Sequence, residues 1–160
     1  MGDRKGGLSL KQNIKYEKYI AVKTRYICDN MALKKTVSGI ARDALAFILE
    51  ASKSTHPHEF AGLLRSDGRL ISEVVLVPGT TSDEGSARML LSMMPLDMSI
   101  VGSVHSHPVH DLRFSEADID MFGAKGYYNI IAAYPYTEKD WVCYNPMGEK
   151  VSLPIVEAGK

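Results

Sequence analysis

The chain is poor in cysteine and carries no excess charge of either sign. Only Cys28 and Cys143 occur in its 160 residues, far apart and outside any Cys-x-x-Cys pattern. This spacing excludes a disulfide framework or a thiolate metal cluster, and we expect two reduced thiols. The 19 basic and 19 acidic side chains cancel, so no broad electrostatic field would attract nucleic acid or an anionic membrane. Partners must therefore be recognised by local chemistry.

Long hydrophobic runs are also missing. No apolar stretch reaches the length of a membrane span, and charged residues interrupt the N-terminal segment where a signal peptide would have its apolar core. We therefore expect a cytoplasmic location, with no membrane or nucleic-acid partner. A hydrophobic content of 45% over 160 residues is enough for one globular domain and too little for two. We predict this domain at residues 31–160, preceded by an N-terminal extension at residues 1–30.

A helix and a hairpin are predicted in the first half of this domain. Apolar residues recur at helical spacing from Ser38, the expected N-cap, to the break at His56-Pro57. Two apolar segments then flank the Ser66-Asp67-Gly68 turn, at residues 60–65 and 69–77. They predict a β-hairpin.

The second half is predicted to consist mainly of strands. Ser115 and Asp118 form a Ser-x-x-Asp pattern that opens a second helix as a capping box. The resulting order of helix, hairpin, strands, helix and strands predicts an α/β fold of the mixed α+β kind. Helices should pack on a mixed sheet rather than form a regular βαβ array. Strands are expected at residues 87–94, 99–107, 127–134, 141–145 and 150–156.

The segment with recognisable chemistry is His105-Ser106-His107-Pro108. Side chains two residues apart on a strand point to the same face, so the two imidazoles converge. Zinc binds neutral imidazole nitrogen and carboxylate oxygen, and catalytic zinc sites use three protein ligands and leave one position to water. Asp118, in the first turn of the predicted helix, is the candidate third ligand. We therefore predict one zinc ion per chain at His105, His107 and Asp118, although iron or cobalt would accept the same set.

A metal-activated water also needs a proton acceptor. Zinc lowers the pKa of a bound water from about 15.7 to roughly 7, which still leaves a proton to be removed and delivered to a leaving amine. Glu59 follows the first predicted helix at the head of a strand and is the best candidate for this general base. On composition alone it would be an ordinary surface residue.

Together these residues resemble the JAMM or MPN-plus metalloproteases: Glu59, then His105-x-His107, seven residues, Ser115, two residues and Asp118. The resemblance runs from about Met31 to the C-terminus and is greatest to the small archaeal members. It implies a curved sheet between helices, of JAMM/cytidine-deaminase-like architecture. It also implies zinc at the two histidines and the aspartate, a water activated by Glu59, and a Ser115 that helps hold the developing oxyanion.

The same resemblance implies a substrate class. The better-known members of the family hydrolyse isopeptide bonds at the C-terminus of ubiquitin-like modifiers, so the expected partner is a ubiquitin-like modifier or sulfur-carrier protein and its conjugates. Two alternatives stay open. Relatives that lack the metal residues serve as protein-binding scaffolds, and the three ligands alone would equally suit a small-molecule metallohydrolase. For Ser115 and Asp118, a helix cap without chemistry is a further alternative.

Other polar and aromatic residues are expected to have structural roles. His56 and His58 lie around a proline in a predicted loop and should be on the surface. His110 is not expected as a ligand, because Val109 stands where metallo-β-lactamase-like hydrolases have the aspartate of H-x-H-x-D-H. The aromatic residues toward the C-terminus are expected in the core: Tyr127, Tyr128, Tyr134, Tyr136, Trp141 and Tyr144.

Overall fold

The computed structural model describes residues 37–76, 97, 99–116, 118–119 and 126–157, which all belong to one compact unit of the chain. The predicted extension at residues 1–30, the predicted strand at 87–94 and Cys28 lie outside the described residues. No helix among the described residues is long and apolar enough to cross a bilayer. The elements are β1 (Gly39–Ala41), α2 (Arg42–Thr55), β2 (Ala61–Asp67), β3 (Leu70–Leu76), β4 (Ile100–His107), β5 (Tyr128–Ala133), β6 (Trp141–Tyr144) and β7 (Ile155–Val156).

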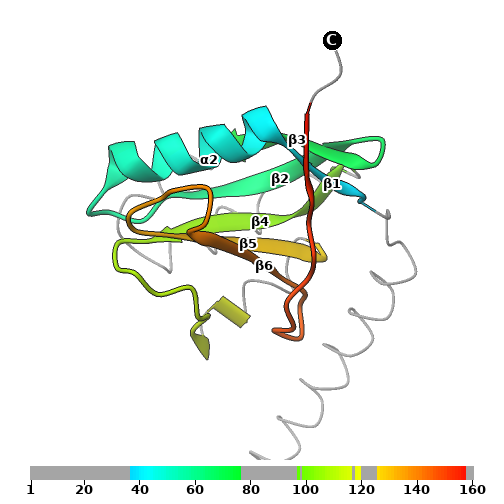
Figure 1. The fold of residues 1–160 in the computed structure, drawn as a ribbon. Coiled ribbons are helices and arrows are strands. Elements are labelled where there is room, and N and C mark those ends of the chain that lie inside the picture. Colours follow the sequence, from blue (N-terminus) through cyan, green and yellow to red (C-terminus); the bar gives the residue numbers. More distant parts are fainter. Residues whose placement is uncertain (1–36, 77–96, 98, 117, 120–125, 158–160) are drawn as a thin grey trace, which may run out of the picture. The chain divides into compact units, whose positions relative to one another are not determined.

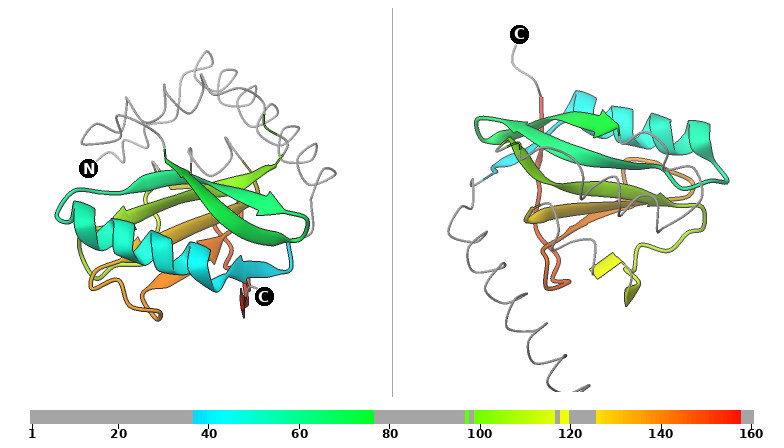
Figure 2. Two further views of the ribbon diagram at one scale, coloured as in Figure 1. Left: turned by 90° about the horizontal axis from the view of Figure 1, so that it is seen from above. Right: turned by 180° about the vertical axis from the view of Figure 1, so that it is seen from behind.

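The strands form one curved sheet in the order β6-β5-β4-β2-β3-β1-β7 (Figure 1). Three neighbouring pairs are parallel, namely β4 with β5, β1 with β3 and β1 with β7. The pairs β2–β3, β2–β4 and β5–β6 are antiparallel. The predicted α/β fold with a mixed sheet is therefore confirmed. Helix α2 lies across one face of the sheet, as the view from above shows (Figure 2).

The first predicted helix exists, but its predicted start was wrong. Helix α2 begins at Arg42, its N-cap is Ala41, and no side chain caps it. Ser38, the expected N-cap, instead donates from its hydroxyl to the backbone carbonyl of Arg69 at 3.0 Å. Residues 39–41, directly before the helix, form β1. Ile40 in this strand pairs with both β3 and β7 and is fully buried. Pairing on both sides of β1 outweighs the helical periodicity that Ile40 shares with α2.

Most of the other secondary-structure predictions within the described residues hold with small shifts, and one strand is shorter than predicted. The hairpin is formed by β2 and β3, and its turn falls at residues 68–69, where Gly68 adopts a φ of 59°. Strands β4, β5 and β6 lie within their predicted ranges. The strand predicted at 150–156 is reduced to β7 and a single bridge from Lys150 to Tyr144. Cys143 is a free buried thiol, as expected.

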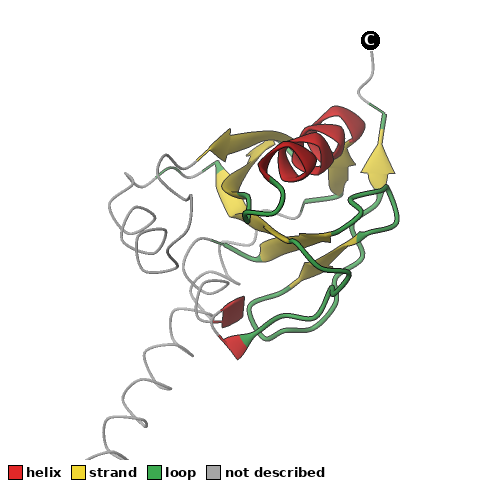
Figure 3. Ribbon diagram, turned by 90° about the vertical axis from the view of Figure 1, so that its left-hand side faces the viewer, coloured by secondary structure: helices red, strands yellow, loops and turns green. Residues whose placement is uncertain are grey.

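The two faces of the sheet are packed differently. The face toward α2 carries the main core, which includes Ile48, Leu64, Val104 and Ile130, all fully buried. The opposite face carries a smaller cluster, in which Ile131 and Tyr144 are buried and three partly buried apolar residues pack against them: Leu112, Ile119 and Val142. Figure 3 shows the long helix α2 on one side of the strands and the short helical pieces, at residues 116 and 118–119, on the other. Segment 108–119 is therefore anchored on the smaller face.

Candidate metal centre

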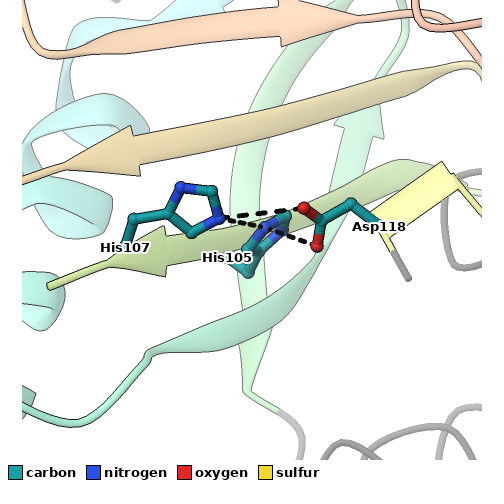
Figure 4. A group of neighbouring side chains, drawn as sticks. All are labelled: His105, His107 and Asp118. Carbon is teal, nitrogen blue, oxygen red and sulfur yellow. Dashed lines mark hydrogen bonds and ion pairs between the residues drawn. The ribbon is translucent and has the colours of Figure 1, made fainter. Parts of the chain in front are cut away.

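Three potential metal ligands meet on this smaller face. The metal-ligating atoms of His105, His107 and Asp118 all lie within 4.8 Å of one another. The Nε2 atoms of the two histidines are 3.1 Å apart, and Asp118 Oδ1 lies 3.0 Å from His105 Nε2. The second carboxylate oxygen lies 3.8 Å from His107 Nε2. Figure 4 shows the three side chains converging from β4 and from the helical turn.

Strand β4 fixes the direction of both histidines. It runs between β2 and β5, and His105 is paired with Ala61 on one side and with Ile131 on the other. Residues paired across neighbouring strands share a face, and successive residues alternate. Val104 therefore points into the α2 core, whereas His105 shares the face of Ile131. His107, two residues on, shares that face, as the sequence predicted.

The position of Asp118 depends on the small cluster beneath it. Ile119, the next residue, packs against Ile131 and Tyr144. The Tyr144 hydroxyl also donates to the backbone carbonyl of Leu112 at 3.0 Å, and its ring meets Phe114 edge-on with centroids 5.0 Å apart. These contacts hold both ends of the segment that carries the carboxylate over the end of β4.

A hydrogen bond selects the tautomer of His107. Its Nδ1 lies 2.8 Å from the backbone carbonyl oxygen of Asp111. Because a carbonyl only accepts, Nδ1 must carry the proton, and in the neutral ring Nε2 is left with a free lone pair directed at the cluster. An oriented imidazole of this kind is typical of metal ligands. The carbonyl of Asp111 was not recognised from the sequence, which does not reveal backbone partners.

Asp118 is ionised in this setting. Burial raises the pKa of its carboxyl. The hydrogen bond and charge interaction with His105, together with hydrogen bonds from Ser115, have a larger effect in the opposite direction and hold this pKa well below its usual range. The cluster thus offers two imidazole nitrogens and one carboxylate. This donor set fits zinc, which catalytic sites hold through three protein ligands.

Ser115 forms the predicted capping box with Asp118. The Ser115 backbone amide donates to Asp118 Oδ2 at 2.6 Å, and the Asp118 amide donates to Ser115 Oγ at 3.2 Å. Ile119 N–H donates to the Ser115 carbonyl at 3.3 Å, which begins the helix. The capping role is thus present, and the hydroxyl proton of Ser115, which the cap does not use, can still be donated to another group.

Glu59 lies in the stretch between α2 and β2, next to the strand that pairs with β4. It is exposed and precedes β2 by two residues. Ala61 pairs with His105, and Phe60 and Ser106 exchange hydrogen bonds, from Ser106 N to the Phe60 carbonyl at 2.9 Å and from Phe60 N to Ser106 Oγ at 2.8 Å. Continued two residues beyond its last pair, this register would place Glu59 opposite His107, on the face of the imidazoles.

The remaining histidines are not part of the cluster. His56 and His58 are exposed, as predicted. His110 is 72% exposed and its Nδ1 bonds to the Tyr134 backbone carbonyl at 2.9 Å. One ring nitrogen of His110 is thus hydrogen-bonded at the surface. This geometry agrees with the prediction that His110 is not a metal ligand.

Tyr136 is a neighbour of the site whose role the sequence did not reveal. It is buried, as expected of a core aromatic, yet its hydroxyl is 3.1 Å from the His107 backbone carbonyl. Burial raises the pKa of Tyr136, an interaction with Ser106 lowers it, and the negative charge of Glu59 raises it. Tyr134, by contrast, is 49% exposed, against the expectation that it packs in the core.

Known proteins share both sequence and fold with this chain. A protein from Haloferax volcanii described as a probable metalloprotease is 43% identical over 134 residues, which cover 78% of this chain and 83% of the relative. The structure of a JAB1/MPN domain protein from Archaeoglobus fulgidus has a TM-score of 0.63 at 40% identity, over 74% of this chain and 99% of that one. A structure described as "JAMM: a metalloprotease-like zinc site in the proteasome and signalosome" has a TM-score of 0.62 at 39% identity, over 76% and 100%.

The prediction of a zinc cofactor is supported from two sides. The described residues include a His-His-Asp group able to bind a metal ion, and a similar chain of known structure is described by its zinc site. The family of prokaryotic homologues of the JAB domain matches residues 41–144. The chain therefore belongs to this prokaryotic JAB-domain family, among the JAMM/MPN metalloprotease-like proteins.

Proposed function

We propose that the chain is a zinc-dependent metallopeptidase that hydrolyses peptide or isopeptide bonds at the C-terminus of small ubiquitin-like or sulfur-carrier proteins. The observation that carries the proposal is the convergence of the ligating atoms of His105, His107 and Asp118 within 4.8 Å, with His107 held in the tautomer that leaves the Nε2 lone pair free to bind a metal. A zinc ion held by these residues would supply a polarised water whose pKa is lowered to roughly 7.

The chain's own residues would move the protons. Glu59 accepts a proton from the attacking water as the new carbon–oxygen bond forms, and delivers it to the amine nitrogen as the carbon–nitrogen bond breaks. Its proposed place opposite His107 is supported by the pairing of Ala61 with His105. The hydroxyl of Ser115 donates to the carbonyl oxygen on which negative charge develops. This role is compatible with the cap, because the cap uses only a lone pair of Ser115 Oγ.

The substrate class rests on family membership and on access. The resemblance to JAMM/MPN-plus isopeptidases supports a ubiquitin-like modifier or sulfur-carrier protein as the partner. His105 is almost fully buried whereas His107 keeps 15% of its side chain exposed. Because His107 stays partly accessible, an extended, flexible tail could bring its last peptide bond to the metal without unfolding of the modifier.

The test is cleavage of a ubiquitin-like protein fused to a short peptide, measured beside zinc content. We expect the wild type to cleave, a chelator to abolish cleavage, and Glu59→Gln to retain zinc while turnover falls by about a hundred- to ten-thousand-fold. Glu50→Gln is the matched control, since Glu50 is exposed on α2 and pairs only with Lys53 among the described contacts.

Other outcomes would replace the proposal. Bound zinc with turnover only of small esters or amides would indicate a small-molecule metallohydrolase. A chain that binds a modifier but neither zinc nor any scissile substrate would be a protein-binding scaffold. Full activity in Glu59→Gln would contradict the assignment of the base.

A further inference from the structure

Tyr136 lies between the two segments that carry the proposed chemistry. It belongs to the loop that joins β5 to β6, and its side chain is among the largest that are fully buried. Its hydroxyl lies 3.1 Å from the backbone carbonyl oxygen of His107, at the end of β4, and 3.3 Å from Nδ1 of His56, in the stretch between α2 and β2 that contains Glu59.

The first contact holds the metal-ligand strand. The Tyr136 hydroxyl donates to the backbone carbonyl of His107 at 3.1 Å, and the Tyr134 amide donates to the same carbonyl at 3.1 Å. The carbonyl oxygen thus accepts two hydrogen bonds from the same loop, one for each lone pair. His107 is the last residue of β4, where pairing with neighbouring strands stops. Its backbone is therefore held at the point where a strand end would otherwise fray.

The second contact holds the stretch that contains Glu59. His56 Nδ1 lies 3.3 Å from the Tyr136 hydroxyl, which donates its own proton to His107, so the imidazole is the donor. The rings of His56 and Tyr136 also meet edge-on, with centroids 6.0 Å apart. Ser106, whose hydroxyl accepts the Phe60 amide, interacts with the same phenol. Glu59 therefore lies between His56, which bonds to Tyr136, and Phe60, which bonds to Ser106.

The backbone of Tyr136 indicates that its side chain is needed. Its φ is +62°, the left-handed region that glycine adopts without strain. A tyrosine there carries a backbone cost that glycine would not. Contacts of the phenol must offset this cost. Strained residues of this kind gather at functional sites.

We propose that Tyr136 is a positioning residue that sets Glu59 relative to His107 by bonding both of their segments through one hydroxyl. This inference rests on the proposed function, since it takes Glu59 as the base and His107 as a ligand. The residue touches neither substrate nor metal. It fixes the separation over which the proton is moved, and misplacement of about 1 Å in an active site can cost roughly a hundredfold in rate.

The test compares Tyr136→Phe with Tyr128→Phe. Each variant removes one buried hydroxyl that bonds to backbone, because Tyr128 accepts from Val37 N at 3.1 Å and donates to the Val37 carbonyl at 3.3 Å, away from the site. We expect Tyr136→Phe to keep its zinc, to keep KM within about threefold, and to lose about 10- to 100-fold in kcat. Amides of Phe60 and Ser106 should exchange with deuterium about tenfold faster. Tyr128→Phe should change none of these by more than about twofold.

The outcomes separate this inference from the proposed function. If the wild type cleaves and Tyr136→Phe has the same kcat, or if Tyr128→Phe loses as much, the inference is overturned while the metallopeptidase stands. If the wild type cleaves nothing, the proposed function fails, and unchanged exchange at the Phe60 and Ser106 amides of Tyr136→Phe would overturn the link between the two segments. If Tyr136→Phe does not fold, His56→Ala, at an exposed position, replaces it. We then expect a loss of about three- to tenfold in kcat with faster exchange, and an unchanged kcat would overturn the inference.

Discussion

Ser115 and Asp118 hold each other through a reciprocal pair of hydrogen bonds, of 2.6 Å from the Ser115 amide to Asp118 Oδ2 and of 3.2 Å from the Asp118 amide to Ser115 Oγ. One carboxylate oxygen is thus committed to the backbone, and Oδ1 faces His105 at 3.0 Å. The same residue therefore starts a helix and presents a potential metal ligand.

Ser115 variants should separate capping from catalysis. Ser115→Ala loses both the cap and the hydroxyl, and we expect it to lower the free energy of unfolding by about 1 kcal/mol and kcat by about a hundred- to a thousandfold. Ser115→Asp keeps a capping acceptor but has no proton to donate, so it should recover stability and not turnover. Ser115→Thr should keep both. Thermal melting and turnover measure the two properties, and recovery of turnover by Ser115→Asp would leave Ser115 as a cap alone.

Removal of the carboxylate ligand should release the metal. We expect about one zinc per wild-type chain and almost none in Asp118→Ala, because two imidazoles alone make an incomplete catalytic set. Zinc at a hundredfold its Kd should stabilise the wild type by about 2.7 kcal/mol. Elemental analysis and melting with and without zinc check this. Asp43→Ala, in the first turn of α2, is the control and should behave as the wild type. If Asp118→Ala still bound one zinc per chain, Asp118 would not be a ligand.

Gly102 should tolerate no side chain. It lies in the middle of β4, and an added Cβ would come within 1.5 Å of the Tyr128 backbone oxygen on β5. The two strands would have to separate, so we expect Gly102→Ala to lower the free energy of unfolding by about 3 kcal/mol or more. Gly68→Ala, in the hairpin turn with nothing within 4 Å but a φ of +59°, should cost only about 1 kcal/mol. Urea unfolding of both variants distinguishes the clash from backbone strain, and equal losses would contradict the prediction.

Asp140 should stabilise the fold in a pH-dependent way. Its carboxylate accepts from the Thr137 hydroxyl at 2.5 Å and the Thr137 amide at 2.8 Å, and these bonds, with the charges of His110 and Lys139, lower its pKa below the usual 3.8. A lowered pKa in the folded chain adds stability above pH 3.8, which is lost as the pH falls through the folded pKa. The difference in urea midpoint between wild type and Asp140→Asn, both metal-free, should therefore be larger at pH 7 than at pH 3. An equal difference at the two values would contradict the prediction.

Sequence patterns predicted best where the partner of a residue is near in the chain or fixed by strand alternation. His105 and His107 share a face because they are two residues apart on a strand, and Ser115 caps Asp118 three residues on. The prediction failed where a distant pairing decides the outcome. Ile40 continues the helical periodicity, yet pairing with β3 and β7 makes it part of a strand.

Contacts with backbone atoms explain most of what could not be predicted at the site. The Asp111 carbonyl that orients His107 and the His107 carbonyl that binds Tyr136 have no signature in the amino-acid types. The density of aromatic residues indicated a core position for Tyr136 and could not distinguish it from Tyr134, which is exposed. The proposed place of Glu59 opposite His107 extrapolates the register of β2 and β4, and a register is set by the whole sheet.

The unequal packing of the two sheet faces has a consequence for laboratory evolution. Most of the apolar burial lies toward α2, whereas segment 108–119 rests on a small cluster around Ile131 and Tyr144. Libraries that vary the exposed positions of this segment, such as Val109, His110 and Arg113, would leave the α2 side untouched. New substrate preferences could therefore be selected with little loss of folded protein.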